Sequence, residues 1–241
     1  MAERDPIAEF AAVQQKYASE AEGHFRDLPD DLKQTWRSVT GAMNTMNIEA
    51  NGASSRLEKM SEDRTSLGPD PHRVMHDFAE LASATLETHR ATARTRLDVY
   101  TNLLRAAARP SVPADPQRQN LLRDDLRTKL SGIPPDQQIG VMRTVASGEN
   151  RELAGLLNSE WGQDFRRTLG HGKEIDDVIH EETIRGSAQH GVGKEKAAAL
   201  ALANGVPAAE KAFVAAHVHA KSVIDKVRPG QPVIGKWSGG Y

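Results

Sequence analysis

Two histidines stand four residues apart at His72 and His76, and Asp77 follows the second one. Side chains four residues apart lie on one face of a helix. A His–Asp pair on such a face is the type of group that metal-dependent phosphohydrolases use, but it needs further ligands from other helices. The alternative is a solvated or interface face. Metal-dependent hydrolysis is therefore a third hypothesis for function, and we expect neither a metal nor a cofactor.

Two further segments match part of a known catalytic motif but lack residues that the motif requires. Residues 186–195 are rich in Gly and Lys, but a phosphate-binding loop needs a Gly five residues before its Gly-Lys pair, where Ala188 stands, and Glu195 replaces its hydroxyl residue. His180 begins a sequence like that of a zinc protease helix, but the second His at the fifth position is missing. We expect a helix-linking loop and an ordinary helix.

Acidic side chains gather on one predicted helix. Paired carboxylates can act as general acid and base when burial separates their pKa values. Here apolar residues are interleaved with them, and Arg185 follows Glu181 by four residues, which is typical of an amphipathic surface helix. We expect no catalysis from this stripe, whose members are Glu174, Asp176, Asp177, Glu181 and Glu182.

The chain of 241 residues contains no cysteine, which excludes disulfide scaffolds, thiol nucleophiles and Cys-ligated metal sites. No coherent catalytic group emerges elsewhere, so we expect no enzyme. No apolar run is long enough to cross a membrane, and the first residues carry acids in place of an apolar signal segment. We expect a location in a virion if the protein is viral, and in the cytoplasm otherwise.

The elements that carry these residues are predicted to be helices. Asp-Pro pairs at 5–6, 70–71 and 115–116 each precede a segment rich in Ala, Leu and Arg, and Asp followed by Pro is a favourable helix start. No alternating run of β-branched residues predicts a strand. The fold class is therefore all-α, with helices expected over 6–27, 30–64, 71–108, 116–131, 135–147, 149–169 with a break near Gly162, 173–189, 194–203 and 207–227.

The helix predicted over 71–108 has apolar residues at steps of three and four, which indicates one buried face. At 1.5 Å per residue it is about 55 Å long. Many residues of this face are small, so we expect an elongated N-terminal hairpin or bundle that is stabilised by packing on another chain. The predicted face consists of Met75, Ala79, Ala82, Leu86, His89, Ala93, Leu97, Tyr100 and Leu104.

Three prolines between Pro110 and Pro116 predict a linker. The resulting domains are a long-helix bundle over 1–109, the linker over 110–116, a small globular helical domain over 117–226 and an extended tail over 227–241. The tail spaces apolar anchors through a Gly- and Pro-rich segment, which is typical of a docking segment, although a disordered end is the alternative. The predicted partner-docking residues are Val233, Ile234, Trp237 and Tyr241.

Charge is distributed unevenly along the chain. Residues 1–70 carry eight basic and thirteen acidic side chains, whereas residues 186–241 carry seven basic and three acidic ones. Residues 194–217 resemble a helix-turn-helix, with Gly205-Val206 at the turn, although Lys211 replaces an inward apolar residue and few side chains could read bases. A nucleic-acid-associated protein is therefore the alternative hypothesis for function.

The segment 121–157, which begins Leu-Leu-Arg-Asp-Asp-Leu and runs through Ile-Pro-Pro-Asp and Ser-Gly-Glu-Asn-Arg-Glu-Leu, resembles helical structural proteins of bacteriophage virions. The resemblance covers about 37 residues and brings no catalytic residues with it. It implies a protein that packs against neighbouring subunits. We accordingly expect a non-enzymatic structural protein of a larger assembly such as a phage head, neck or tail, in homo- or hetero-oligomeric form.

Overall fold

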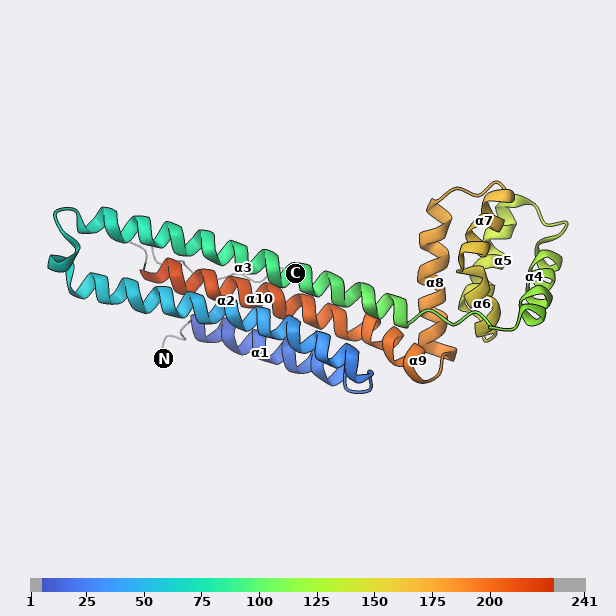
Figure 1. The fold of residues 1–241 in the computed structure, drawn as a ribbon, viewed down its shortest axis with the longest axis horizontal. Helices are drawn as coiled ribbons and strands as arrows, with labels where there is room; N and C mark the ends of the chain where they lie inside the picture. The colour runs from blue at the N-terminus through green and yellow to red at the C-terminus, as the bar shows by residue number, and fades with distance from the viewer. Residues whose placement is uncertain (1–5, 228–241) are drawn as a thin grey trace. The chain divides into compact units, whose positions relative to one another are not determined.

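The computed structural model describes residues 6–227 and confirms the all-α class for that part of the chain (Figure 1). Two compact units are present. The described helices are α1 (Pro6–His24), α2 (Asp30–Glu62), α3 (Pro71–Ala107), α4 (Pro116–Leu130), α5 (Pro135–Ser147), α6 (Arg151–Leu157), α7 (Glu160–Thr168), α8 (Glu174–His190), α9 (Gly193–Leu200) and α10 (Val206–Val227), with a 3-10 turn η1 (Arg64–Leu67) and a π-helical segment η2 (Ala201–Gly205).

Local sequence cues set the helix starts, as predicted. The Asp115 carboxylate accepts a hydrogen bond from the backbone N–H of Gln117 at 2.9 Å, with Pro116 at the first helical position. The Asp70 carboxylate accepts one from the N–H of Arg73 at 3.1 Å at the start of α3. Each carboxylate satisfies an N–H group that has no partner inside its helix.

The first unit is a helical bundle built from α1, α2, α3 up to Tyr100, and α10. α2 and α3 form an antiparallel pair joined through η1, and α10 packs extensively on α2 (Figure 1). Trp36 and Tyr100 close one end of the core with ring centroids 5.6 Å apart. The predicted buried face of α3 is confirmed in this unit at Met75, Ala79, Leu86, Ala93, Leu97 and Tyr100, with Ala82 and His89 half-buried.

Small residues supply much of the α10 side of this core. Ala209, Ala212 and Ala216 are each 0% exposed. Alanine lets helices approach closely, but it removes little apolar surface from water per residue. Larger side chains from α2, such as Met43 and Met46, fill the space opposite.

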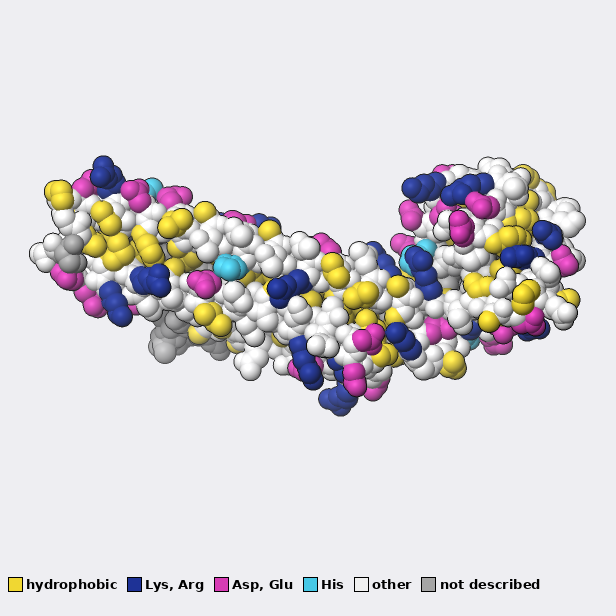
Figure 2. All heavy atoms as spheres, viewed as in Figure 1, with side chains coloured by type: hydrophobic (Ala, Val, Ile, Leu, Met, Phe, Trp, Pro, Cys, Tyr) yellow, Lys and Arg dark blue, Asp and Glu magenta, His cyan; other side chains and the backbone are white. Residues whose placement is uncertain are grey.

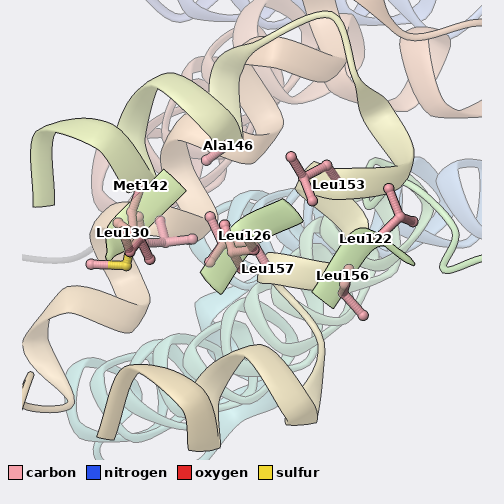
Figure 3. Close-up of a cluster of buried hydrophobic side chains, with 9 residues drawn as sticks. Leu122, Leu126, Leu130, Met142, Ala146, Leu153, Leu156 and Leu157 are labelled. Carbon is pink, nitrogen blue, oxygen red and sulfur yellow. The ribbon is translucent and has the colours of Figure 1, made fainter. Parts of the chain in front are cut away.

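The second unit contains His24–Pro29 and Thr101–Asn204. Leucines of α4 and α6 form its core with side chains from α5 and α8 (Figure 3). Figure 3 shows Leu126 and Leu157 facing each other between the helices. The buried cluster consists of Leu122, Leu126, Leu130, Met142, Ala146, Leu153, Leu156, Leu157 and Ile179.

The domain boundaries of the structure differ from those predicted. Residues 205–226 belong to the first unit, because α10 buries its apolar face against α2. The proline-rich segment 110–116 lies inside the second unit, where the carbonyl oxygen of Pro110 would be 2.8 Å from a Cβ at Gly155. A segment in such close contact is part of a folded unit and not a flexible linker.

The break in the helix predicted over 149–169 falls at Asn158 and Ser159, before the expected Gly162. The Ser159 side chain accepts a hydrogen bond from the N–H of Gly162 at 3.3 Å and thereby starts α7. A Cβ at Gly162 would lie 2.0 Å from the carbonyl oxygen of Leu157. Gly162 therefore permits the tight junction of α6 and α7 and is not the break itself.

Candidate interaction surface

His72, His76 and Asp77 lie at the exposed start of α3. The imidazole of His76 is 4.0 Å from the Asp77 carboxylate and 3.9 Å from that of Glu80, and its side chain is 54% exposed. Within residues 6–227, no group of three His, Asp or Glu side chains is placed to hold a metal ion. The exposure of His72, His76 and Asp77 agrees with the interpretation of this pair as part of a solvated face.

The Gly- and Lys-rich segment 186–195 serves helix packing. Gly186 is buried inside α8, and a Cβ there would meet the Cα of Ser147 in α5 at 2.7 Å. Glu195, in the first turn of α9, lies 3.0 Å from the guanidinium of Arg151. A carboxylate engaged with Arg151 thus stands where a phosphate-binding loop has its hydroxyl residue.

Two members of the acidic stripe form structural ion pairs. Asp176 pairs with Arg166, whose side chain is 1% exposed and also donates to the carbonyl oxygen of Leu157 at 2.5 Å. Glu182, 9% exposed, pairs with Arg185 at 2.9 Å and with Arg143 at 3.4 Å. Arg185 therefore pairs with Glu182 and not with Glu181 as predicted. These ion pairs connect helices: Arg166 of α7 pairs with Asp176 of α8, and Arg143 of α5 with Glu182 of α8.

His180, on the same helix, lies 3.3 Å from the amide nitrogen of Asn158. Burial lowers the pKa of His180, and the nearby cations Arg109 and Arg105 lower it further. Its neutral form is therefore favoured, as expected for a histidine enclosed in a helical unit.

The helix-turn-helix predicted over 194–217 is wrong. The π-helical segment η2 runs from α9 directly into α10, so no turn separates these two described helices. They also belong to different units: α9 packs on α8, whereas α10 packs on α2. The alanines that resembled the first helix of a DNA-binding hairpin are buried at Ala198 and Ala199. On the face drawn in Figure 2, Lys and Arg side chains are interspersed with Asp and Glu.

The predicted docking residues Val233, Ile234, Trp237 and Tyr241 lie outside the described residues 6–227. Inside that range, no helix is long and apolar enough to cross a membrane.

An arginine that the sequence analysis missed organises the second unit. The Arg151 side chain donates to the carbonyl oxygens of Ala146 and Gly148, each at 3.0 Å. Its other terminal nitrogen donates to the carbonyl of Thr183 at 2.8 Å and the hydroxyl of Ser187 at 2.7 Å. One guanidinium thus connects α6 with the end of α5 and with α8. The signal in the sequence is the polar pair Thr183 and Ser187 on the buried face of α8.

The surface feature that distinguishes the first unit is a charge-free exposed face on α3. Between Leu81 and Val99, the charged residues of α3 lie outside this face, and Arg96 and Asp98 border its two edges. Leu81 is 65% and Val99 50% exposed. Because 27% of the chain is charged, an uncharged face about 27 Å long at 1.5 Å per residue is unusual. We call this set the α3 face: Leu81, Ala84, Thr85, Thr88, Ala91, Thr92, Thr95 and Val99, all exposed.

The polar atoms of the α3 face are satisfied within the helix. The hydroxyls of Thr85 and Thr88 donate to the carbonyl oxygens four residues earlier, at 2.9 and 3.2 Å. Those of Thr92 and Thr95 do the same, each at 3.0 Å. A hydroxyl that already has a partner can be covered without the cost of burying an unsatisfied group. The face therefore presents methyl groups to a partner, and its hydroxyl groups need no hydrogen bond from that partner.

The neighbouring side of α2 extends this surface. Arg96 of α3 donates to the carbonyl oxygen of Ser38 at 3.0 Å, which places Ser38 on the side of α2 next to α3. Thr45 and Gly52 follow at steps of seven residues and lie on the same side. A Cβ at Gly52 would meet no atom within 4 Å, and Ile48, between them, is 68% exposed. On this side of α2, the uncharged Ser38, Thr45 and Gly52 thus stand among the charged residues Arg96, Glu49 and Arg56.

Comparison of the chain with protein-family models, curated proteins and solved structures found no match. The surfaces of this chain are thus the basis for a functional proposal.

Proposed function

We propose that this chain is a non-enzymatic helical protein that packs into a larger assembly through the α3 face. The observation that carries the proposal is the uncharged, internally satisfied set of side chains between Leu81 and Val99. Exposed apolar groups on one continuous surface mark sites of protein–protein contact, whereas scattered ones do not. A phage particle is the assembly that the resemblance of residues 121–157 suggests.

Sedimentation through a density gradient tests this proposal. The position of the full chain in the gradient is measured in an extract of the phage or cell that encodes it. We expect it to sediment with a complex much heavier than its own 26.3 kDa. The variant Leu81→Asp places a charge on the α3 face and is expected to remain at the top of the gradient.

The second unit offers a matched control. Leu121 is 64% exposed, almost the same as Leu81 at 65%, but lies on α4. Leu121→Asp should sediment like the unmodified chain. Sedimentation of both variants with the complex would contradict a role for the α3 face. Binding to duplex DNA that weakens steeply with salt would replace the proposal with a nucleic-acid function.

A further inference from the structure

We propose that the partner of the α3 face is a second copy of this chain, with the two α3 helices antiparallel and centred on Arg90. This inference rests on the proposed function, because it names the partner of the same surface. It is argued from the spacing, the symmetry and the neighbours of the exposed side chains.

The exposed residues of the α3 face have the spacing of a helix–helix seam. Six of them alternate in steps of four and three: Leu81, Thr85, Thr88, Thr92, Thr95 and Val99. This is the repeat by which one helix packs along another in a coiled coil. The buried face of α3 already packs within the bundle, so this second seam points outward. Its natural complement is another helix with the same spacing.

The same six residues form a palindrome, which favours a second copy over an unrelated helix. In a two-fold symmetric contact, residue i faces residue j of the partner and j faces i. Leu81 and Val99 each stand nine residues from Arg90, and both are apolar. The inner pairs are Thr85 with Thr95 and Thr88 with Thr92. In an antiparallel pair, the apolar contacts therefore close both ends and threonines meet in the middle.

The residues beside the seam do not bring like charges together at the centre of the contact. In the register centred on Arg90, Ala91 would lie opposite His89 of the second copy, and Ala84 opposite Arg96. Arg90 itself points to the other side of α3, where it pairs with Glu87 at 2.8 Å. An antiparallel pair also opposes the two helix dipoles, which a parallel pair would align.

The adjacent side of α2 widens the contact. A single helix seam is narrow compared with the roughly 1,200–2,000 Å² that specific interfaces bury. Gly52 and Thr45 are small, so a second bundle can approach α2 closely, and Ile48 supplies an apolar side chain that is 68% exposed.

Disulfide trapping tests the partner and the register together. The chain has no cysteine, so Thr85→Cys and Thr95→Cys each introduce a sole thiol. The two positions are about 15 Å apart along the helix at 1.5 Å per residue. We expect a covalent dimer under mild oxidation only when the two variants are mixed. Light scattering of the unmodified chain should give twice 26.3 kDa, and Leu81→Asp should halve that mass while Leu121→Asp does not.

Each other outcome overturns a defined part of the inference. Cross-linking of each variant with itself would show a parallel pair and overturn the antiparallel register. A monomer without cross-links would overturn the second copy as partner. If Leu81→Asp still abolished sedimentation with the assembly, the proposed function would stand and a different protein would cover the face. Cross-links that form only in a chain ending at Val227 would assign the face to the chain's own C-terminal segment.

Discussion

The guanidinium of Arg151 lies 3.0 Å from the carboxylate of Glu195, although 44 positions separate the two residues in the sequence. Their side chains are only 13% and 16% exposed. The pair holds the start of α9 against the start of α6, while the remaining nitrogens of Arg151 bind carbonyl oxygens and the Ser187 hydroxyl. The second unit thus depends on an ionic contact between α6 and α9 as well as on its leucine core.

Replacing Arg151 with Leu should lower the stability of the second unit by about 3 kcal/mol, because a largely buried carboxylate loses its cation. Hydrogen exchange of the α8 and α9 amides measures this loss separately from the first unit. Arg118→Leu is the control: Arg118 pairs with Glu152 at 2.8 Å, but both side chains are about half exposed. That change should cost less than about 1 kcal/mol. Equal effects of the two variants would contradict the role of Arg151.

Gly186→Ala should destabilise the second unit by about 1–3 kcal/mol, because the added Cβ would overlap the backbone of Ser147. Gly140→Ala, also in a helix of this unit, meets no atom within 4 Å. Alanine is the better helix former, so this control should raise the stability by about 0.5–1 kcal/mol. Urea unfolding followed by circular dichroism compares the two. A stabilising effect of Gly186→Ala would contradict the close approach of α8 and α5.

The first unit should become less stable as the pH falls below about 6.5, because of His219. Burial lowers the pKa of this histidine, and its Nδ1 has no hydrogen-bond partner among the described residues. The unfolded chain therefore binds a proton that the folded chain resists, so the stabilising contribution is present above about 6.5 and is lost on acidification.

Hydrogen exchange of the α10 amides between about pH 7.5 and 5 measures this dependence, after correction for the intrinsic pH effect on exchange rates. His219→Gln should flatten the dependence, whereas His76→Gln, at an exposed position, should not. Glu87 does not interfere in this pH range. Arg90 and His217 lower the pKa of Glu87, so the stabilising contribution of its carboxylate to the folded state is lost only below its ordinary pKa of 4.5. An unchanged slope in His219→Gln would contradict the assignment to His219.

Ala212→Leu should destabilise the bundle by about 1–3 kcal/mol, because Ala212 is 0% exposed in the small-residue side of the core. Val214→Leu, on the same helix but 43% exposed, should be close to neutral. Thermal unfolding by calorimetry compares the two variants. A neutral effect of Ala212→Leu would show that α10 does not pack tightly in the bundle.

The sequence predicted the secondary structure and most of the buried face of α3, but it did not predict which helices share a core. The helices at 194–203 and 207–227 are close in the sequence, and this suggested one hairpin. In the structure, α10 packs on α2, which ends at Glu62, 144 positions before α10 begins at Val206. The apolar face of α10 could pack on α9 or on α2, so the spacing of its residues alone could not predict which helix it contacts.

The sequence alone also did not predict the α3 face as a candidate interaction site. α3 carries two sets of residues at steps of three and four, one containing Leu86 and Leu97 and the other Leu81 and Val99. Spacing indicates that each set shares a face, but it cannot tell which face is covered. The sequence did not indicate that Thr88 and Thr92 belong to an interaction surface, because the hydrogen bond of each hydroxyl to its own helix is seen only in the structure.

The sequence by itself determined the all-α class and the starts of α3 and α4, because a capping Asp followed by Pro acts on the N–H groups of the very next turn. Tertiary structure alone decided the partner of α10, the burial of Arg151 and Arg166, and the exposure of the α3 face. These properties depend on contacts between residues far apart in the chain. Local propensity does not encode such contacts, since many helix pairings satisfy the same pattern of apolar residues.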